Sequence, residues 1–260
     1  MHRSSLIRST AATLFSLSTQ LIPANANAAD IRVLCSNNMS RTLKAVVSDF
    51  EKTTGHRLVM EFTNAGSIRK RVLAGESADV VLVQRATVDT LLKKGKITSG
   101  SVKDMARSPM VVFVRAGAAR PKIDTVEAFT TLLRAARSVS YPDPARGGLS
   151  GIFLAGLLER LAMAEVLKHK TILALNTATT VQNVAEGKAE FGMSQFSEIR
   201  TSGVDIVGRF PDELDGNIVL SAAVLTASRQ PDAAMALVNF LSSPATSAAV
   251  KANRLDPIAH

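Results

Sequence analysis

The stretch Ser138–Leu161, SVSYPDPARGGLSGIFLAGLLERL, carries the pattern from which the fold can be argued. A short run of β-branched and aromatic residues ends at two prolines, passes through Gly147 and Gly148, and leads into regularly spaced apolar residues. This order predicts a strand, a glycine-rich turn that lets the backbone approach a neighbour closely, and a helix with Ser150 as its N-cap. A helix N-terminus of this kind suits an anion or another polar small molecule. The same pattern is also typical of an ordinary turn that holds no ligand.

The alternation of strand and helix begins near the N-terminus. Strands are predicted at Ile31–Cys35, Arg57–Phe62 and Asp79–Val83, and the helices that follow them end at Gly55, Gly75 and Gly95. The last of these strands is an unbroken apolar run, as expected for a parallel strand covered on both faces. This order of elements requires a parallel sheet with helices on its faces.

The rest of the chain continues as α/β and contains no repeat. Strands are predicted at Met110–Arg115, Ile172–Leu175, Ala189–Gln195, Val204–Arg209 and Ile218–Thr226. One helix is predicted after a capping box formed by Asp124 and Glu127, and further helices are predicted at Thr177–Glu186, Pro231–Leu241 and Pro244–Ala252. The order predicts two lobes, with residues 29–111 and 216–260 in lobe 1 and residues 112–215 in lobe 2. Ligands collect beyond the carboxyl ends of strands, so the loops Ser36–Ser40, Thr63–Ser67 and Asp143–Ser150 are expected at a cleft between the lobes.

The first 28 residues have the pattern of a cleavable signal peptide. Two arginines precede the modestly apolar segment Ala11–Ile22, and Ala26-Asn27-Ala28 is a small-x-small cleavage signal. The apolar segment is too short and too rich in Ser and Thr to span a bilayer. We therefore expect a periplasmic protein that begins near Ala29. It has no lipid anchor at the cleavage point and, with Cys35 as its single cysteine, no intrachain disulfide.

The net charge of +9 raises nucleic acid as a possible partner. The charge is dispersed, however, and the densest groups, at 69–71 and 93–96, lie on predicted helices whose other face is apolar. Aromatic residues make up only 4% of the chain and Trp is absent, which leaves few side chains for base stacking. We expect no nucleic-acid partner, and a basic surface would instead steer anions inward.

Catalytic and metal-binding motifs are absent from the sequence. A hydrolase elbow needs G-x-S-x-G, but the sequence around Ser150 is GGLSGI, with the closing glycine one position early. The four histidines lack the spacing of a zinc site, and there is neither HExxH nor CxxC. We therefore expect no metal, no cofactor and no enzymatic activity, and a secreted serine hydrolase that uses Ser150 stays as an alternative.

Five segments resemble periplasmic molybdate-type substrate-binding proteins of ABC transporters. They are IRVLCSNNMSRTLKAVVSDFEKTTGHRL from Ile31, EFTNAGSIRKRVLAGESADVVLV from Glu61, YPDPARGGLSGIF from Tyr141, AEGKAEFGMSQFSEI from Ala185 and VGRFPDEL from Val207. The resemblance implies a two-lobed α/β fold of the type 2 periplasmic binding class, in which each lobe is a mixed, mostly parallel sheet flanked by helices. It also implies that an oxyanion such as molybdate or tungstate is held between the lobes by neutral donors. A membrane permease and an ATPase are the implied partners of a monomeric receptor.

The resemblance also implies positions for the ligand-binding residues. They are Asn38 after the first strand, Ala65 after the second with Ser67 two residues on, Ser150 in the glycine turn, Thr177 near a second backbone donor, and Gln195 near the hinge. Amide and hydroxyl groups can donate hydrogen bonds, so the implied pocket is polar and neutral. Because Asn38, Ala65 and Gln195 replace the family's hydroxyl groups, a small organic carboxylate or hydroxylated ligand is the alternative.

Three side chains keep two interpretations each at this stage. Asn38 is either a ligand donor or an alternative to Ser40 as a helix N-cap. Arg146 either pairs with an acidic group of the ligand or faces solvent. Glu198 either orients Gln195 or has a structural role.

Overall fold

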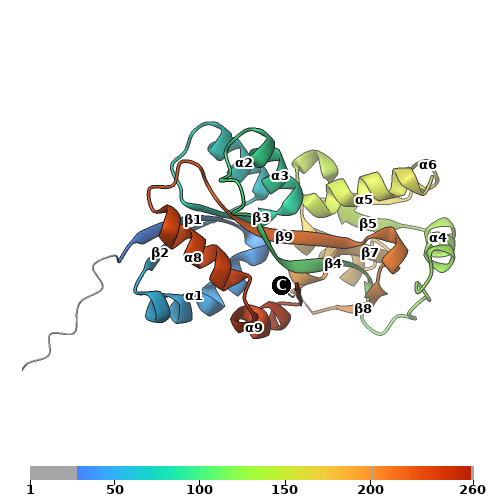
Figure 1. Cartoon of the computed structure of the whole chain (residues 1–260). Coiled ribbons are helices and arrows are strands. Elements are labelled where there is room, and N and C mark those ends of the chain that lie inside the picture. Colours follow the sequence, from blue (N-terminus) through green and yellow to red (C-terminus); the bar gives the residue numbers. More distant parts are fainter. Residues whose placement is uncertain (1–27, 201, 259–260) are drawn as a thin grey trace, which may run out of the picture.

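Strands and helices alternate along the chain, and the computed structural model describes residues 28–200 and 202–258. All but the last residue of the expected signal peptide therefore lies outside the described residues. The ten strands of the described chain belong to one mixed sheet with the order β2-β1-β3-β9-β4-β7-β5-β6, to which β8 and β10 add by pairing with β4. The two ends of this sheet form the two lobes seen in Figure 1.

Lobe 1 is built on the strands β1 (Asp30–Ser36), β2 (Arg57–Thr63) and β3 (Val80–Gln84). β1 lies in the middle and pairs in parallel with both neighbours. Every residue of β3 is buried, as expected for a parallel strand with helices on both faces. The three predicted strands of this region are confirmed to within a residue or two.

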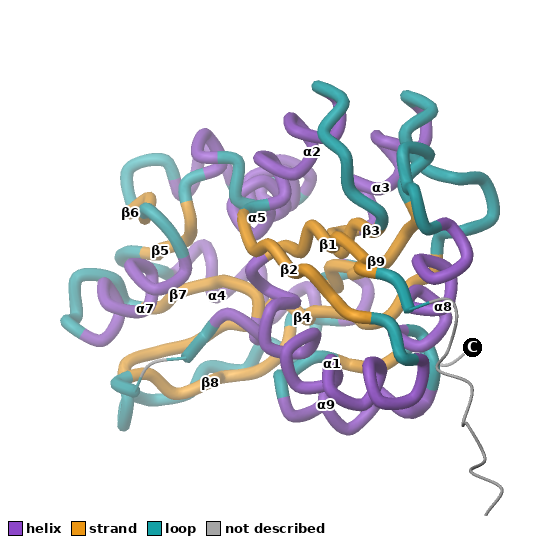
Figure 2. The backbone as a smooth tube through the Cα atoms, turned by 90° about the vertical axis from the view of Figure 1, so that its left-hand side faces the viewer, coloured by secondary structure: helices purple, strands orange, loops and turns teal. Residues whose placement is uncertain are grey.

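Helices cover both faces of this part of the sheet. α1 (Ser40–Thr54) packs on one face together with α8 (Pro231–Leu241) and α9 (Ser247–Ala252), whereas α2 (Ala65–Leu73) and α3 (Arg85–Lys93) pack on the other (Figure 2). Successive side chains of a strand point to opposite faces. Cys35 therefore joins the cluster beneath α1, while Leu34 joins the cluster beneath α2 and α3.

Two antiparallel strands connect the lobes. β9 (Asn217–Val224) pairs with β3 and with the first half of β4 (Lys103–Arg115), and the second half of β4 pairs with β7 (Phe191–Gln195) and β8 (Val204–Arg209). Figure 1 shows β4 and β9 running along the middle of the molecule. The sequence predicted only Met110–Arg115, because the first half of β4 contains charged residues and Pro109 and lacks an apolar pattern. Pairing with β9 makes that half a strand.

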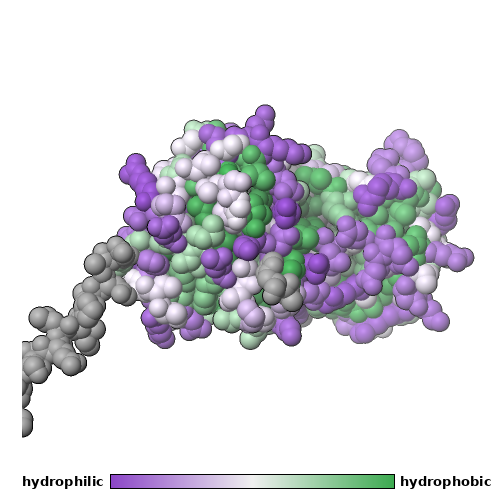
Figure 3. All heavy atoms as spheres, viewed as in Figure 1, coloured by the Kyte–Doolittle hydropathy of each residue, from purple (hydrophilic) through white to green (hydrophobic). Residues whose placement is uncertain are grey.

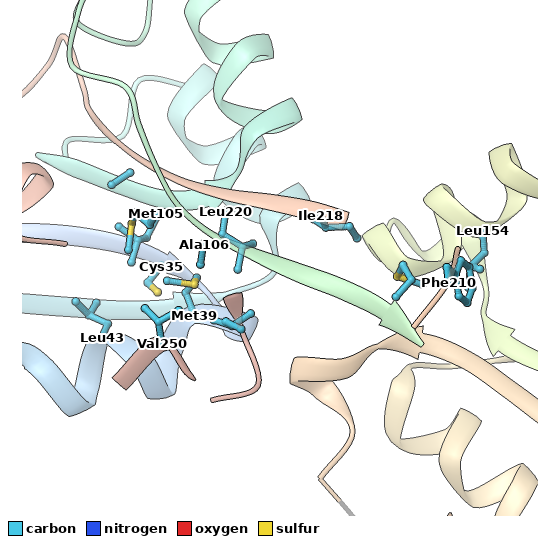
Figure 4. Packing of buried hydrophobic residues seen from close by; sticks show 14 of the residues in the cluster. Cys35, Met39, Leu43, Met105, Ala106, Leu154, Phe210, Ile218, Leu220 and Val250 are labelled. Atoms are coloured by element: carbon cyan, nitrogen blue, oxygen red, sulfur yellow. The ribbon is translucent and has the colours of Figure 1, made fainter. Parts of the chain in front are cut away.

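Lobe 2 has β5 (Val139–Pro142) between β6 (Thr171–Ala174) and β7, all parallel. α4 (Val126–Ala135), α5 (Leu149–Arg160) and α6 (Ala164–Leu167) contribute to the main core cluster, and α7 (Thr177–Ala185) packs on the opposite face. The main cluster extends through both lobes. Figure 4 shows Cys35 and Met39 at its lobe 1 end, and Leu154 and Phe210 at its lobe 2 end.

Two predicted helix caps are wrong by one or two residues. Thr125, and not Asp124, caps α4, because its side chain accepts a hydrogen bond from the backbone N–H of Ala128 at 3.1 Å. Gly148, and not Ser150, precedes α5, so Ser150 is the second residue of that helix. Its hydroxyl contacts another side chain, which is described below.

The chain ends against lobe 1. After α8, the short helix η5 (Pro244–Thr246) leads into α9, and β10 (Asp256–Pro257) pairs with β4. No single helix of the described residues has the length and apolarity needed to cross a membrane. The bent pair formed by α8 and the segment Pro244–Ala252, which is η5 with α9, meets the criteria of length and composition together, with an angle of 59° between its halves.

The surface carries the dispersed charge that the sequence indicates. Hydrophilic residues spread over both lobes on the face seen in Figure 3. Arg69, Lys70, Lys93 and Lys94 are exposed, which agrees with solvated helix faces. Arg71 instead forms ion pairs with its acidic neighbours Glu61 and Glu76.

Candidate functional site

A cavity of about 400 Å³ lies between the lobes, at the carboxyl ends of the parallel strands. Lobe 1 contributes to its lining Ser36, Asn37, Asn38, Asn64, Ala65 and Gln84; lobe 2 contributes Pro142, Asp143, Arg146, Gly147, Gly148, Leu149, Ser150, Leu175, Asn176, Thr177, Ala178, Gln195 and Glu198. In α/β sheets, ligands bind at this place because loops lead there into helix N-termini. Cavities of small-molecule sites have about this size.

The glycine turn shapes one wall of the cavity. After β5, the short helix η2 (Pro144–Arg146) ends at Gly147, whose φ of 75° is in the left-handed region that favours glycine. The closest approach of the backbone, however, occurs at Gly151. A Cβ atom there would lie 2.2 Å from the carbonyl oxygen of Pro142. The first turn of α5 is therefore pressed against the end of β5, and this contact fixes the position of Ser150.

A chain of hydrogen bonds links the two lobes across the cavity. The hydroxyl of Ser36 donates to Asn38 Oδ1 at 2.6 Å, and Asn38 Nδ2 lies 3.5 Å from Gln195 Oε1. Gln195 Nε2 donates to Ser150 Oγ at 2.9 Å and to Glu198 Oε1 at 3.3 Å. Gln195 is 1% exposed. It therefore connects the loop after β1 to the first turn of α5.

Glu198 is the carboxyl group at the inner end of this network. Its Oε2 accepts a hydrogen bond of 2.5 Å from the hydroxyl of Thr177, which lies 2.6 Å from the hydroxyl of Ser194. Burial raises the pKa of Glu198 above its usual value, against the lowering effects of the Thr177 hydroxyl and of the charge of Arg200. The carboxyl group therefore takes up a proton more readily than an exposed glutamate does.

The N-terminal turns of several helices border the cavity. Residues of η1 (Asn37–Met39) and the first residues of α2, α5 and α7 all line it. The first N–H groups of a helix lack acceptors within the helix, and the dipole places partial positive charge there. Asn64 Oδ1 accepts from Ser67 N at 2.8 Å and Asn176 Oδ1 from Thr179 N at 3.0 Å. The earlier N–H groups of both helices stay available, so the cavity favours an anion.

The structure brings together five of the six residues expected at the site, namely Asn38, Ala65, Ser150, Thr177 and Gln195. Ser67 does not line the cavity, and its backbone N–H donates to Asn64 Oδ1, which caps α2. Ala65 is buried at the start of α2 and offers its backbone rather than a side-chain donor.

The structure also places the three side chains that had two interpretations each. Asn38 is not a helix cap, since α1 begins at Ser40 after Met39. The side chain of Arg146 is 58% exposed at the rim of the cavity, with its Nε 3.8 Å from a carboxylate oxygen of Asp143. Glu198 does contact Gln195.

Gln84 and Asn64 also line the cavity, although neither was expected there from the sequence. Gln84 is the last residue of β3 and is only 6% exposed, and its Oε1 has no hydrogen-bond partner within the described chain. A signal was present, because a polar side chain that directly follows a buried parallel strand lies at the carboxyl edge of the sheet. Asn64 follows β2 in the same way and caps α2.

No group of three or more His, Cys, Asp or Glu side chains among residues 28–200 and 202–258 is placed to hold a metal ion. Nor does any histidine of this part of the chain line the cavity. Ser150 Oγ accepts a hydrogen bond from the amide of Gln195, which cannot act as a general base. The geometry therefore does not favour a serine hydrolase.

Known proteins resemble the chain over most of its length. An aconitate isomerase from Pseudomonas sp. is 32% identical over 237 residues, which cover 88% of each protein. The molybdate-binding protein ModA of Azotobacter vinelandii is 27% identical over 240 residues, with 91% of this chain and 93% of that protein covered. The substrate-binding domain of a putative molybdenum ABC transporter from Clostridium difficile superposes with a TM-score of 0.74 at 16% identity, covering 89% of this chain and 100% of that one.

These matches agree with the expected fold of type 2 periplasmic binding proteins. The model of the family described as bacterial extracellular solute-binding protein matches residues 31–253. The matched segment contains every residue that lines the cavity. The chain therefore belongs to the bacterial extracellular solute-binding proteins.

Proposed function

We propose that this chain is the periplasmic receptor of an uptake system. It captures a small anion between its lobes and delivers it, as a monomer, to a membrane permease and its ATPase. The observation that carries the proposal is the convergence of polar groups from both lobes on one cavity, with Asn38 on one side and Ser150, Thr177 and Gln195 on the other. A ligand that contacts both lobes stabilises their closed arrangement, which is the form that a transporter can distinguish.

Two classes of anion fit these donors. The first is a tetrahedral oxyanion such as molybdate or tungstate, and the second is a small organic carboxylate. An oxyanion fills the space of roughly three water molecules, at about 30 Å³ each. It would leave most of the cavity of about 400 Å³ empty unless the lobes close further. A carboxylate of four to six carbons fills more of the cavity, and the exposed guanidinium of Arg146 at the rim suits a second acid group.

Glu198 bears on the choice as well. A charged carboxylate repels an anion, but burial raises the pKa of Glu198 and so eases its protonation. A protonated Glu198 is a donor rather than a repelling charge.

Calorimetry with the purified mature chain tests the proposal. The probes are molybdate, tungstate, sulfate and phosphate on one side, and cis-aconitate, trans-aconitate and citrate on the other. We expect saturable binding of at least one probe, weakened about tenfold or more in Gln195→Leu, because that variant removes donors to Ser150 and Glu198. Gln182→Leu is the matched control, since Gln182 lies exposed on α7 outside the cavity and its side chain donates to Glu186. If no anion of either class binds, the proposed receptor function is wrong.

A second candidate function is an isomerase of a small unsaturated carboxylate. Two observations favour it: the position of Glu198 in the cavity wall and the 32% identity to an aconitate isomerase. One carboxylate can remove a proton from a carbon next to an acid group and return it to the far end of the allylic system, so the double bond moves without net consumption of a reagent. The raised pKa of Glu198 suits this task.

Proton NMR of the chain incubated with cis-aconitate in D₂O tests this activity. Catalysis predicts the formation of trans-aconitate, which carries deuterium only to the extent that the proton held by Glu198 exchanges with solvent before its return, at a rate that Glu198→Gln lowers about a hundredfold or more while binding persists. Unchanged cis-aconitate after prolonged incubation would leave the receptor function alone.

A further inference from the structure

Gln84 differs from the other polar side chains of the cavity wall because its carbonyl oxygen is unsatisfied. Its side chain is only 6% exposed at the end of β3, and Oε1 is buried without a hydrogen-bond partner within the described chain. Buried polar atoms are nearly always hydrogen-bonded, because losing water without a replacement costs free energy. An exception in the wall of a ligand cavity suggests that the partner arrives with the ligand.

The other groups around the cavity either have hydrogen-bond partners or are donors, whereas Gln84 Oε1 is an acceptor. Asn38, Gln195 and Thr177 have hydrogen bonds within the wall. The helix N-termini around the cavity present N–H donors, which satisfy the oxygens of an anion. A fully ionised oxyanion or carboxylate offers only acceptors and therefore cannot satisfy Gln84 Oε1.

We propose that Gln84 is a specificity residue that accepts a hydrogen bond from a hydroxyl group of the ligand, so that the receptor selects hydroxylated carboxylates. The inference rests on the proposed anion receptor and narrows its ligand class. The acid groups face the helix N-termini, and the hydroxyl faces Gln84. A carboxylate with the same skeleton but no hydroxyl leaves Oε1 unsatisfied, as it is in the ligand-free protein, and gains nothing there.

Matched pairs of ligands isolate this one hydrogen bond. Malate and succinate differ by a hydroxyl group, as do citrate and propane-1,2,3-tricarboxylate. Calorimetry of the unmodified chain is expected to give an affinity about tenfold higher for the hydroxylated member of the pair that binds. In Gln84→Met, which keeps the length of the side chain and removes the acceptor, the two members should bind with equal affinity.

Thr42 supplies a matched control variant. Its Oγ1 on α1 is the other buried side-chain atom without a partner in the described chain, and Thr42 does not line the cavity. Thr42→Val and Gln84→Met each remove an unsatisfied atom, so each is expected to raise the melting temperature of the ligand-free protein by roughly 2–6 °C. Only Gln84→Met should lose the preference for the hydroxyl group.

The outcomes separate this inference from the proposed function. Equal affinities for both members of a pair in the unmodified chain overturn the role of Gln84, as does a preference that persists in Gln84→Met. A lower melting temperature for Gln84→Met than for the unmodified protein also contradicts it, because Oε1 would then have a partner without ligand. Binding of molybdate or tungstate, with none of the four carboxylates bound, leaves the anion receptor standing and removes the hydroxyl inference. If none of these six probes binds, the hydroxyl inference falls, and the receptor function falls with it only if sulfate, phosphate and the two aconitates do not bind either.

Discussion

Replacing Gly151 by alanine tests whether the contact between α5 and the end of β5 positions the cavity wall. The new Cβ atom would lie 2.2 Å from Pro142 O and 2.9 Å from Pro144 N, both of which belong to the backbone. Neither atom can rotate away, so the helix must move by roughly 1 Å to reach a normal contact distance. Forcing extra volume into a packed site costs about 1–3 kcal/mol.

That cost predicts a measurable fall in stability. A cost of about 2 kcal/mol corresponds to a decrease of roughly 4–8 °C in melting temperature for a chain of this size. The same movement carries Ser150 away from Gln195, and their hydrogen bond of 2.9 Å would then approach or exceed the usual limit. We therefore also expect a weaker affinity, by about tenfold, for whichever anion the unmodified chain binds.

Gly156 provides the control within the same helix. It is exposed, and a Cβ atom there would meet nothing within 4 Å. Because alanine is the better helix former, Gly156→Ala is expected to stabilise the protein by about 0.5–1 kcal/mol and to leave binding unchanged. Thermal unfolding by circular dichroism and calorimetric titration measure both effects. If Gly151→Ala melts within 1 °C of the unmodified protein and binds equally well, the argument from this contact is wrong.

Three further predictions concern titration, a structural carboxylate and the buried thiol. The pKa of Glu198 is raised on folding, so its ionisation favours the unfolded chain. The melting temperature of Glu198→Gln minus that of the unmodified protein should therefore increase as pH rises from about 4 to neutrality. A difference that stays constant across a pH series would contradict this. Asp79 accepts hydrogen bonds from Arg32 N at 2.8 Å, Ser228 Oγ at 2.7 Å and Arg229 N at 3.1 Å. Asp79→Ala should lower the free energy of unfolding, measured by chemical denaturation, by about 3 kcal/mol and leave anion affinity unchanged. An altered affinity would show that this carboxylate also shapes the cavity. Cys35 is buried, and burial raises the pKa of its thiol. A thiol reagent should therefore react with Cys35 only after the protein is unfolded by denaturant, and rapid labelling of the native protein would refute its burial.

Much of the fold follows from local patterns in the sequence. Apolar runs such as the one at β3, helices with one apolar face such as α1, and glycines at positive φ such as Gly55 indicate strands, helices and helix ends without reference to the rest of the chain. The resemblance to solute-binding proteins, carried by the same segments, is confirmed by the family match over residues 31–253.

The errors occur where a residue's structure depends on distant partners. The first half of β4 is a strand because β9 pairs with it, although it contains Lys103, Asp104, Arg107 and Pro109. Serine is a residue type that favours the helix N-cap, but Gly148 occupies the N-cap position of α5. The Ser150 hydroxyl instead contacts Gln195, which lies 45 residues away in the sequence. Ser67 was predicted in the site but does not line the cavity, and its backbone N–H instead donates to Asn64 Oδ1 at the start of α2.

The sequence alone determined the order of strands and helices, the α/β class and the loops from which a ligand site would be built, because hydrophobic periodicity and turn residues act over a few neighbouring positions. The tertiary structure decided which polar groups meet. It joined Asn38 to Gln195, placed Glu198 beside Thr177, and left the carbonyl oxygen of Gln84 without a partner among the described residues. These relations depend on contacts between residues as much as 157 positions apart, and chain folding alone brings such residues together.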